Sequence, residues 1–321
     1  MIATSQHRLA RLHNGSIVAK VGCKQYIQTI TLFLILFTLT AHAQQKLSGQ
    51  AAYNNTKQFL AATGPRWIGS PGHQKAEDFL RAYFAPEKKK GAYAEDSFTI
   101  NTPIGLLPMR NFLIRYPGKK DGLVVVATHY ETNYPLKDTN FIGANDGAAT
   151  TGLLLELASY YRTHANEGYT LVLVFDDGEE AIQQWSATDS LYGTRHLAAK
   201  WSNDGTIKKI KAFIVTDMIG DRDLDLFFDQ NSTPALRDLL HQAAKNTGHL
   251  SSVFKEEAAV EDDHLPFKQR GVPVLDMIDI DYGPNNSWHH TIQDTLDKVS
   301  VRSLQISADL LLETVHLINQ R

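Results

Sequence analysis

The chain has 321 residues, of which 43% are hydrophobic and 21% are charged, and its formal net charge is −3. This composition supplies enough apolar side chains for a sizeable core, which excludes global disorder. The first 43 residues hold four basic residues and no acid, so the rest of the chain has 28 basic and 35 acidic residues. That acidic balance argues against binding to nucleic acid.

Residues 1–43 have the pattern of a secretory signal peptide. Two lysines precede an apolar run over residues 30–40, and the small residues Ala41 and Ala43 follow this run. The run is too short for a comfortable transmembrane helix, with a retained signal anchor as the alternative interpretation. We therefore expect an exported protein, in a bacterial periplasm or secreted, with no stable membrane insertion after cleavage.

The only cysteine of the chain, Cys23, lies inside this predicted signal peptide. A cleaved chain then has no disulfide and no thiol nucleophile, which a chain of this length tolerates in an oxidising compartment. No internal repeat or low-complexity linker interrupts the remainder. We expect residues 44–321 to form a single domain.

Strands and helices alternate along the predicted domain. Two helices are predicted around a Gly/Pro-rich turn within residues 58–84, and further helices over 147–164, 190–201, 233–249 and 299–318. Strands are predicted over 109–118, 121–131, 169–177, 210–220 and 271–280, several of them almost wholly apolar. This alternation predicts a three-layer α/β/α sandwich around a mostly parallel mixed sheet.

Ionisable residues follow three of the predicted strands. His129 ends one strand, Glu179 and Glu180 follow the next, and Asp217 ends a third. Ligands bind outside the carboxyl ends of strands in open α/β sheets, so these residues predict a site there. The alternative for the acidic stretch is a solvated turn. Asp146 precedes a predicted helix, where capping that helix is the alternative to a role in the site.

Aspartate, glutamate and histidine together are ligands that zinc accepts, and catalytic zinc takes three of them with one open position. The segment NSWHHT supplies an imidazole from His289 or His290. Of the two adjacent glutamates, one can bind the metal while the other serves as general base.

These motifs resemble the zinc aminopeptidase superfamily, peptidase family M28. The resemblance rests on His129 and on the stretches GANDGAAT, FDDGEE, TDMIG, DDHLPFKQRGVPVL and HHT. Within that superfamily, the run DGEEAIQQWSATDSLYGTRHLAAKW is more similar to the animal-type glutaminyl cyclases, as is RWIGSPG near the start. The similarity extends from about Arg66 to the last residues.

The resemblance implies a zinc-aminopeptidase-like fold and the cyclisation of N-terminal glutamine of peptides or proteins to pyroglutamate, with release of ammonia. It also implies a role for each matching residue. One zinc per chain would be held by Asp146, Glu180 and His290. Glu179 would be the general acid and base, and Asp217 and Asp262 would form an acidic hydrogen-bonded network around it. Trp185 would line the substrate pocket.

The chain also departs from the cyclase pattern. It reads Trp288-His289-His290-Thr291 where the cyclases read Trp-His-Thr, so His289 falls at the position of the tryptophan. We expect Trp288 to fill that pocket wall from one position away. Three further positions differ from the animal pattern of Cys, Gln and His, namely Thr128, Glu261 and Asp276.

Two other functions fit the same residues. A two-zinc aminopeptidase would use His129 and Asp217 for a second metal ion, whereas a non-catalytic binding domain would normally lose a ligand or Glu179. Residues outside the motifs have simpler interpretations. We expect His73, His164 and His241 on solvated surfaces, and Trp201 in packing.

Overall fold

The computed structural model describes residues 46–321, of which Leu47–Arg321 form one unit. The predicted signal peptide over residues 1–43 lies outside the described residues, as does Gln44. Within the described range, no helix combines the length and the apolar character needed to cross a membrane.

A six-stranded mixed sheet forms the centre of the unit, in the order β1-β2-β4-β3-β5-β8. The strands are β1 (Tyr93–Thr102), β2 (Gly105–Tyr116), β3 (Lys120–His129), β4 (Tyr169–Asp176), β5 (Ile210–Asp217) and β8 (Val274–Ile278). β3, β4, β5 and β8 run parallel, whereas β2 is antiparallel to β4 and β1 is antiparallel to β2. The predicted parallel strands are confirmed, and β1 is an edge strand that the sequence pattern does not predict.

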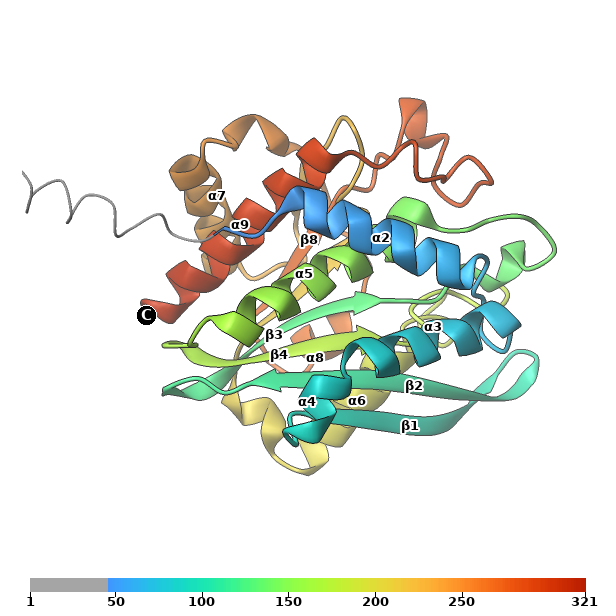
Figure 1. Cartoon of the computed structure of the whole chain (residues 1–321), viewed down its shortest axis with the longest axis horizontal. Helices are drawn as coiled ribbons and strands as arrows, with labels where there is room; N and C mark the ends of the chain where they lie inside the picture. The colour runs from blue at the N-terminus through green and yellow to red at the C-terminus, as the bar shows by residue number, and fades with distance from the viewer. Residues whose placement is uncertain (1–45) are drawn as a thin grey trace, which may run out of the picture. The chain divides into compact units, whose positions relative to one another are not determined.

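Helices cover both faces of the sheet. Figure 1 shows α2, α5 and α9 lying side by side over one face, with α6 on the other side. The helices are α2 (Gly49–Thr63), α3 (Pro71–Tyr83), α4 (Ala85–Lys89), α5 (Thr150–Thr163), α6 (Tyr192–Asn203), α7 (Pro234–Thr247), α8 (Leu265–Lys268) and α9 (Val301–Asn319). The three-layer α/β/α sandwich predicted from the sequence is therefore the observed architecture.

Alternate residues of the central strands enter two separate cores. Val124 and Val126 of β3 pack in the core that α2, α5 and α9 share, whereas Val125 and Ala127 pack against α6 and α8. Strands that are buried on both faces require apolar residues throughout, which explains why β3 and β4 read as continuous apolar runs.

Shorter elements complete the chain. β6 (Leu226–Asp229) and β7 (Val253–Ala258) form a separate two-stranded parallel sheet. The remaining short helices are η1 (Tyr134–Leu136), η2 (Ala144–Ala149), η3 (Thr206–Lys209), η4 (Leu250–Ser252) and η5 (Pro284–Asn286).

The register of the parallel strands brings the polar strand ends together. His129 of β3 pairs with Asp176 of β4, and Asp217 of β5 pairs with Ile278 of β8. The residues that follow these positions therefore emerge at one edge of the sheet, as the sequence predicts.

Candidate active site

A cavity of about 290 Å³ opens at this edge, above the carboxyl ends of the parallel strands. Its lining combines acids, imidazoles and an apolar wall. The lining residues are Asp146, Glu179, Glu180, Trp185, Asp217, Met218, Val260, Glu261, Asp262, Ile278, Ile280, His289 and His290. Seven of the eight site residues expected from the sequence, all except Trp288, thus meet at one cavity.

Asp146 reaches the cavity from a kink before α5. Its backbone leaves the helical region, and Gly147 follows with φ of +83°. A Cβ atom on Gly147 would lie 2.9 Å from Cε1 of His129, so both the turn and the close approach require glycine here. The residue before α5 is Ala149 and makes no side-chain cap. The capping interpretation of Asp146 is therefore wrong.

A fully buried arginine, Arg66, holds the loop that carries Asp146 in place. Arg66 donates hydrogen bonds to four main-chain carbonyl oxygens, those of Tyr130 (2.6 Å), Gly143 (2.9 Å), Asp146 (3.1 Å) and Ile142. Burial lowers the pKa of Arg66 to about 10, which still leaves the guanidinium charged at neutral pH. Arg66 thereby ties the end of β3 to the loop that carries Asp146.

Asp294 fixes the same loop from the opposite end of the chain. Its carboxylate accepts hydrogen bonds from the main-chain N–H groups of Asn145 (2.8 Å) and Asp146 (3.2 Å). Burial raises the pKa of Asp294 to about 7. The orientation of Asp146 therefore depends on contacts from residues distant in sequence on both sides.

Glu179 and Glu180 follow β4 and are both buried. The interpretation of this acidic stretch as a solvated turn is therefore wrong. Glu131 and Asn133, which follow β3, hold Glu180 in place. Asn133 Nδ2 donates to Glu180 Oε2 (2.7 Å), and Glu131 Oε1 accepts from the Glu180 N–H (3.2 Å). Glu180 is thus held by contacts through both its side chain and its backbone.

His290 brings its imidazole to Asp146 and Glu180. Its Nε2 lies 3.0 Å from Glu180 Oε1 and 3.4 Å from Asp146 Oδ2. Burial lowers the pKa of His290, but Glu180 and Asp146 outweigh this effect and raise it to about 11. Asp146 Oδ2 is buried and accepts no hydrogen bond. Two carboxylates and one imidazole that converge in this way suit a divalent cation such as zinc.

His289 lies beside His290 but turns to a different partner. The two ring centroids are 4.1 Å apart, and His289 Nδ1 lies 3.3 Å from Asn286 Nδ2. Asp146, His289 and His290 still offer ligand atoms close together. The contact of His290 with both carboxylates nevertheless distinguishes it as the better candidate ligand.

The carboxyl group of Glu179 is strongly perturbed. Burial raises its pKa well above the usual value, and repulsion from Glu180 and Asp262 adds to the increase. Burial and repulsion from Asp217 likewise raise the pKa of Asp262. Raised pKa values of this kind suit groups that take up and release a proton, which is the property required of a general acid and base.

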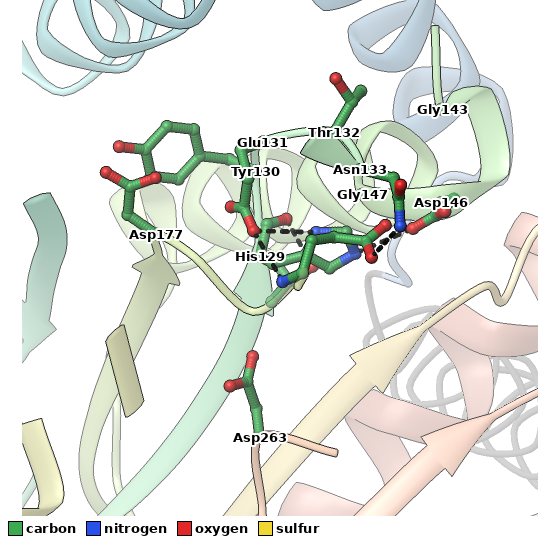
Figure 2. A network of polar contacts seen from close by, with 12 residues as sticks. His129, Tyr130, Glu131, Thr132, Asn133, Gly143, Asp146, Gly147, Asp177 and Asp263 are labelled. Carbon is green, nitrogen blue, oxygen red and sulfur yellow. Dashed lines mark hydrogen bonds and ion pairs between the residues drawn. The ribbon is translucent and has the colours of Figure 1, made fainter. Parts of the chain in front are cut away.

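His129 lies at the centre of a second group of carboxylates. Figure 2 shows His129, Glu131 and Asp146 gathered where β3 ends. His129 Nε2 is 3.2 Å from Asp146 Oδ1 and 3.3 Å from Asp217 Oδ1, and its Nδ1 is 3.8 Å from Glu131 Oε1. The trio His129, Asp146 and Asp217 therefore offers a further set of metal-ligand atoms.

Trp185 stands at the cavity on a loop organised by Asp189. The Asp189 carboxylate accepts hydrogen bonds, each 2.9 Å long, from the main-chain N–H groups of Ile182, Gln183 and Gln184. The Trp185 indole Nε1 donates to Glu261 Oε2 (3.2 Å). Asp189, which lies in the WSATDSLYG run, thus holds in place the loop that carries Trp185.

Trp288 does not line the cavity. Its ring packs edge-to-face on Tyr282 and lies against Gly283, where a Cβ atom would come within 2.3 Å of the indole. His290 adopts a φ of +50°, and His289 and His290 both line the cavity whereas Trp288 does not.

Sequence reasoning missed several residues that support the site, and it placed His73 on the surface. Arg66 belongs to a stretch singled out for its similarity, but no feature of that stretch predicts contacts to distant carbonyls. His73 is buried rather than solvated, and its Nε2 lies 2.9 Å from Asp177 Oδ1. Its spacing from Ala76 and Leu80 on the buried face of α3 was the available signal.

The expectations for the other two histidines and for Trp201 have separate outcomes. His241 is exposed and His164 is half-buried. Trp201 is buried and packs against Phe267, as expected of a packing residue.

The chain is similar to known proteins in both sequence and fold. Residues 111–315 match peptidase family M28. A glutaminyl-peptide cyclotransferase-like protein of Bos taurus is 32% identical over 72% of this chain, and the match covers 66% of that relative, about two thirds of its length. A solved glutaminyl cyclase structure from an Acidobacteriales bacterium is 63% identical, with a TM-score of 0.87, over 88% of this chain and 98% of that chain.

A more distant structure shares the fold alone. The Zn-dependent exopeptidase of Parabacteroides distasonis has a TM-score of 0.74 at 21% identity, over 87% of this chain and 100% of that chain.

Proposed function

Since this chain belongs to the glutaminyl cyclases of peptidase family M28, we propose that it is a glutaminyl-peptide cyclotransferase, an acyltransferase. Its substrates are peptides or proteins with an N-terminal glutamine. The α-amine of that residue attacks its own side-chain amide carbon. A C–N bond forms, the bond to the amide nitrogen breaks, and pyroglutamate and ammonia are the products.

The observation that carries this proposal is the position of Glu179. Its buried carboxyl lines the same small cavity as the convergent Asp146, Glu180 and His290, and Trp185 stands at that cavity. A proton-exchanging acid beside a candidate cation site, in a cavity of about 290 Å³, suits a reaction confined to one terminal side chain.

In the proposed mechanism, Glu179 accepts a proton from the attacking amine and returns it to the departing nitrogen. Negative charge on Asp262 raises the pKa of Glu179, and Asp217 in turn raises the pKa of Asp262, so these acids favour the uptake of a proton by Glu179 in the first step. Zinc bound by Asp146, Glu180 and His290 would polarise the side-chain carbonyl and stabilise negative charge on its oxygen. The reaction is intramolecular, so the placement of the glutamine against Trp185 supplies much of the rate.

We propose one zinc ion per chain. Asp146, Glu180 and His290 form the proposed site, while the trio of His129, Asp146 and Asp217 is the specific observation in favour of a two-zinc aminopeptidase. An aminopeptidase activates water to hydrolyse a peptide bond, whereas cyclisation requires no water. The two functions therefore differ in both metal content and products.

One experiment separates these functions. The purified protein is loaded with zinc and given a Gln-peptide and, separately, a leucine amide. We expect ammonia from the Gln-peptide, no free leucine, about one zinc per chain by elemental analysis, and loss of activity with a chelator. Free leucine without cyclisation, or two tightly held ions in active protein, would favour the aminopeptidase.

We also propose that residues 1–43 are removed during export and that residues 44–321 form the mature enzyme. The sequence pattern around Ala43 supports this, and it leaves Gln44 as the first residue. Gln44 would itself be a substrate, cyclised by another copy or spontaneously. Intact-mass measurement of exported protein should show the loss of one ammonia, and an inactive Glu179→Gln variant should show it more slowly. A different first residue, or lasting uncyclised Gln44 in active protein, would contradict this proposal.

A further inference from the structure

The acidic lining of the cavity has two parts that differ in exposure. Asp146, Glu179, Glu180, Asp217 and Asp262 are all buried. Glu261 is exposed, although it lines the same cavity. Glu261 is therefore the carboxylate of the lining that meets solvent at the mouth.

Glu261 is held in place at this mouth. The indole Nε1 of Trp185 donates to its Oε2 at 3.2 Å, and Trp185 is itself 36% exposed. A carboxylate that uses one oxygen for a fixed hydrogen bond keeps its other oxygen and its charge directed to solvent. The pair therefore forms a defined edge of the cavity rather than a freely moving surface charge.

No basic side chain offsets this charge within the described lining of the cavity, which contains no lysine or arginine. The two imidazoles are His289 and His290, and His290 already contacts Glu180 and Asp146. His289 turns to Asn286, with its Nδ1 3.3 Å from Asn286 Nδ2. Glu261 thus places a carboxylate at the solvent-exposed mouth of the cavity.

Only the first residue of a substrate reacts, so the rest of the peptide leaves the cavity through this mouth. We propose that Glu261 is a specificity-determining residue that selects for a lysine or arginine immediately after the N-terminal glutamine, and against aspartate or glutamate there. This inference rests on the proposed cyclase function and names its preferred substrates. A glutamine at this position, as in the animal-type cyclase pattern, carries no charge and could not select peptides by charge in this way.

The expected selectivity follows from Coulomb's law at a partly solvated surface. A pair of unit charges roughly 6–8 Å apart, at an effective dielectric constant between those of water and a protein surface, changes kcat/KM about 3- to 10-fold for each charged peptide. The ratio between a Gln-Lys and a Gln-Glu peptide should therefore be on the order of 10 to 100, because the two effects are opposite in sign and multiply. High salt should reduce this ratio, since the pair is exposed.

The experiment measures kcat/KM of the zinc-loaded enzyme for Gln-Lys, Gln-Ala and Gln-Glu peptides of equal length. Glu261→Gln removes the charge but keeps an oxygen that can accept the Trp185 hydrogen bond, and Glu261→Lys reverses the charge. Glu256→Gln is the matched control, because Glu256 is exposed on β7 outside the cavity lining and its replacement changes the net charge equally.

We expect the wild-type ratio of Gln-Lys to Gln-Glu to fall to near one in Glu261→Gln, to invert in Glu261→Lys and to persist in Glu256→Gln. The proposal is overturned by a wild-type ratio near one, or by a ratio that survives Glu261→Gln. An equal loss for all three peptides would also overturn it, since Glu261 would then contact the common α-amine. A failure to cyclise any peptide would instead refute the cyclase function itself.

Discussion

Replacement of Arg66 by lysine tests how far the candidate metal site depends on the structure beneath it. The guanidinium donates to four buried carbonyl oxygens, and one of these belongs to Asp146. A lysine ammonium is smaller, has three donors and lacks the planar fork, so it leaves at least one of these carbonyls without a partner. Gly143 O retains a second donor, the Ala148 N–H at 3.3 Å, which limits the damage.

We expect Arg66→Lys to lower the free energy of unfolding by about 2–3 kcal/mol, the cost of one or two buried hydrogen bonds to a charged donor. Removal of all four bonds, as in Arg66→Met, would cost on the order of 6 kcal/mol. Domains are stable by only about 5–15 kcal/mol, so the methionine variant is unsuitable for the test. Zinc affinity of Arg66→Lys should fall by roughly 10-fold or more, as expected for a group that orients a ligand.

The assay is urea unfolding with saturating zinc and with chelator, together with a zinc titration. Arg162→Lys is the control, since Arg162 binds Glu87 and the Tyr83 carbonyl from α5, and neither partner lines the cavity. Weaker zinc binding should make the destabilisation of Arg66→Lys larger in zinc than in chelator. Equal zinc affinity in the variant and the wild type, or equal destabilisation in both conditions, would refute the link between Arg66 and the metal site.

Three further predictions concern single side chains. Glu179→Gln should keep zinc and lose most turnover, whereas Glu180→Gln should lose zinc as well; equal metal loss in elemental analysis would mean that these roles are wrongly assigned. Asp189→Ala should raise KM for Gln-peptides and cost about 2 kcal/mol of stability, because three N–H groups that hold the Trp185 loop lose their acceptor; unchanged kinetics would contradict this. Burial lowers the pKa of His73, but the Asp177 carboxylate outweighs it and raises the pKa above 6.5. The stability that His73 contributes is therefore complete below pH 6.5 and is lost as pH rises through the raised pKa. Unfolding free energies of His73→Gln and wild type should converge with rising pH, and a constant difference would refute the pairing.

The central strands were predictable because they are buried on both faces, which leaves few sequence patterns other than apolar runs. β1 was not predictable in the same way. Its two buried positions are Asp96 and Thr102, so no apolar alternation marks it as a strand. Asp96 is instead bound by Lys200 and Asn111, contacts that exist only once the sheet and α6 are in place. A polar edge strand therefore escapes a pattern that depends on hydrophobic burial.

Some residues of the candidate site could be predicted from the sequence and others could not. Acids and histidines at strand ends were predictable, since parallel topology brings such ends to one edge. The choice between His289 and His290 was not, because it depends on a left-handed turn at His290 that nothing in the pair HH indicates. Trp288 was expected at the cavity because it lies one position from the tryptophan of the cyclase pattern, but it is not part of the lining. Supporting contacts such as those of Asp294 are tertiary, so local sequence carries no signal for them.

The proposed ligands come from three separate loops, those before α5, after β4 and before α9. They are spread along the chain from Asp146 to His290, and the backbone of Asp146 is itself held by Arg66 and Asp294, one from each end of the domain. Ion capture is therefore coupled to completion of the sheet and cannot precede it. Side-chain chemistry alone selects weakly among divalent transition metals, for which affinity follows a fixed order. The compartment in which the chain folds, through the metals available there, thus decides which ion the enzyme carries.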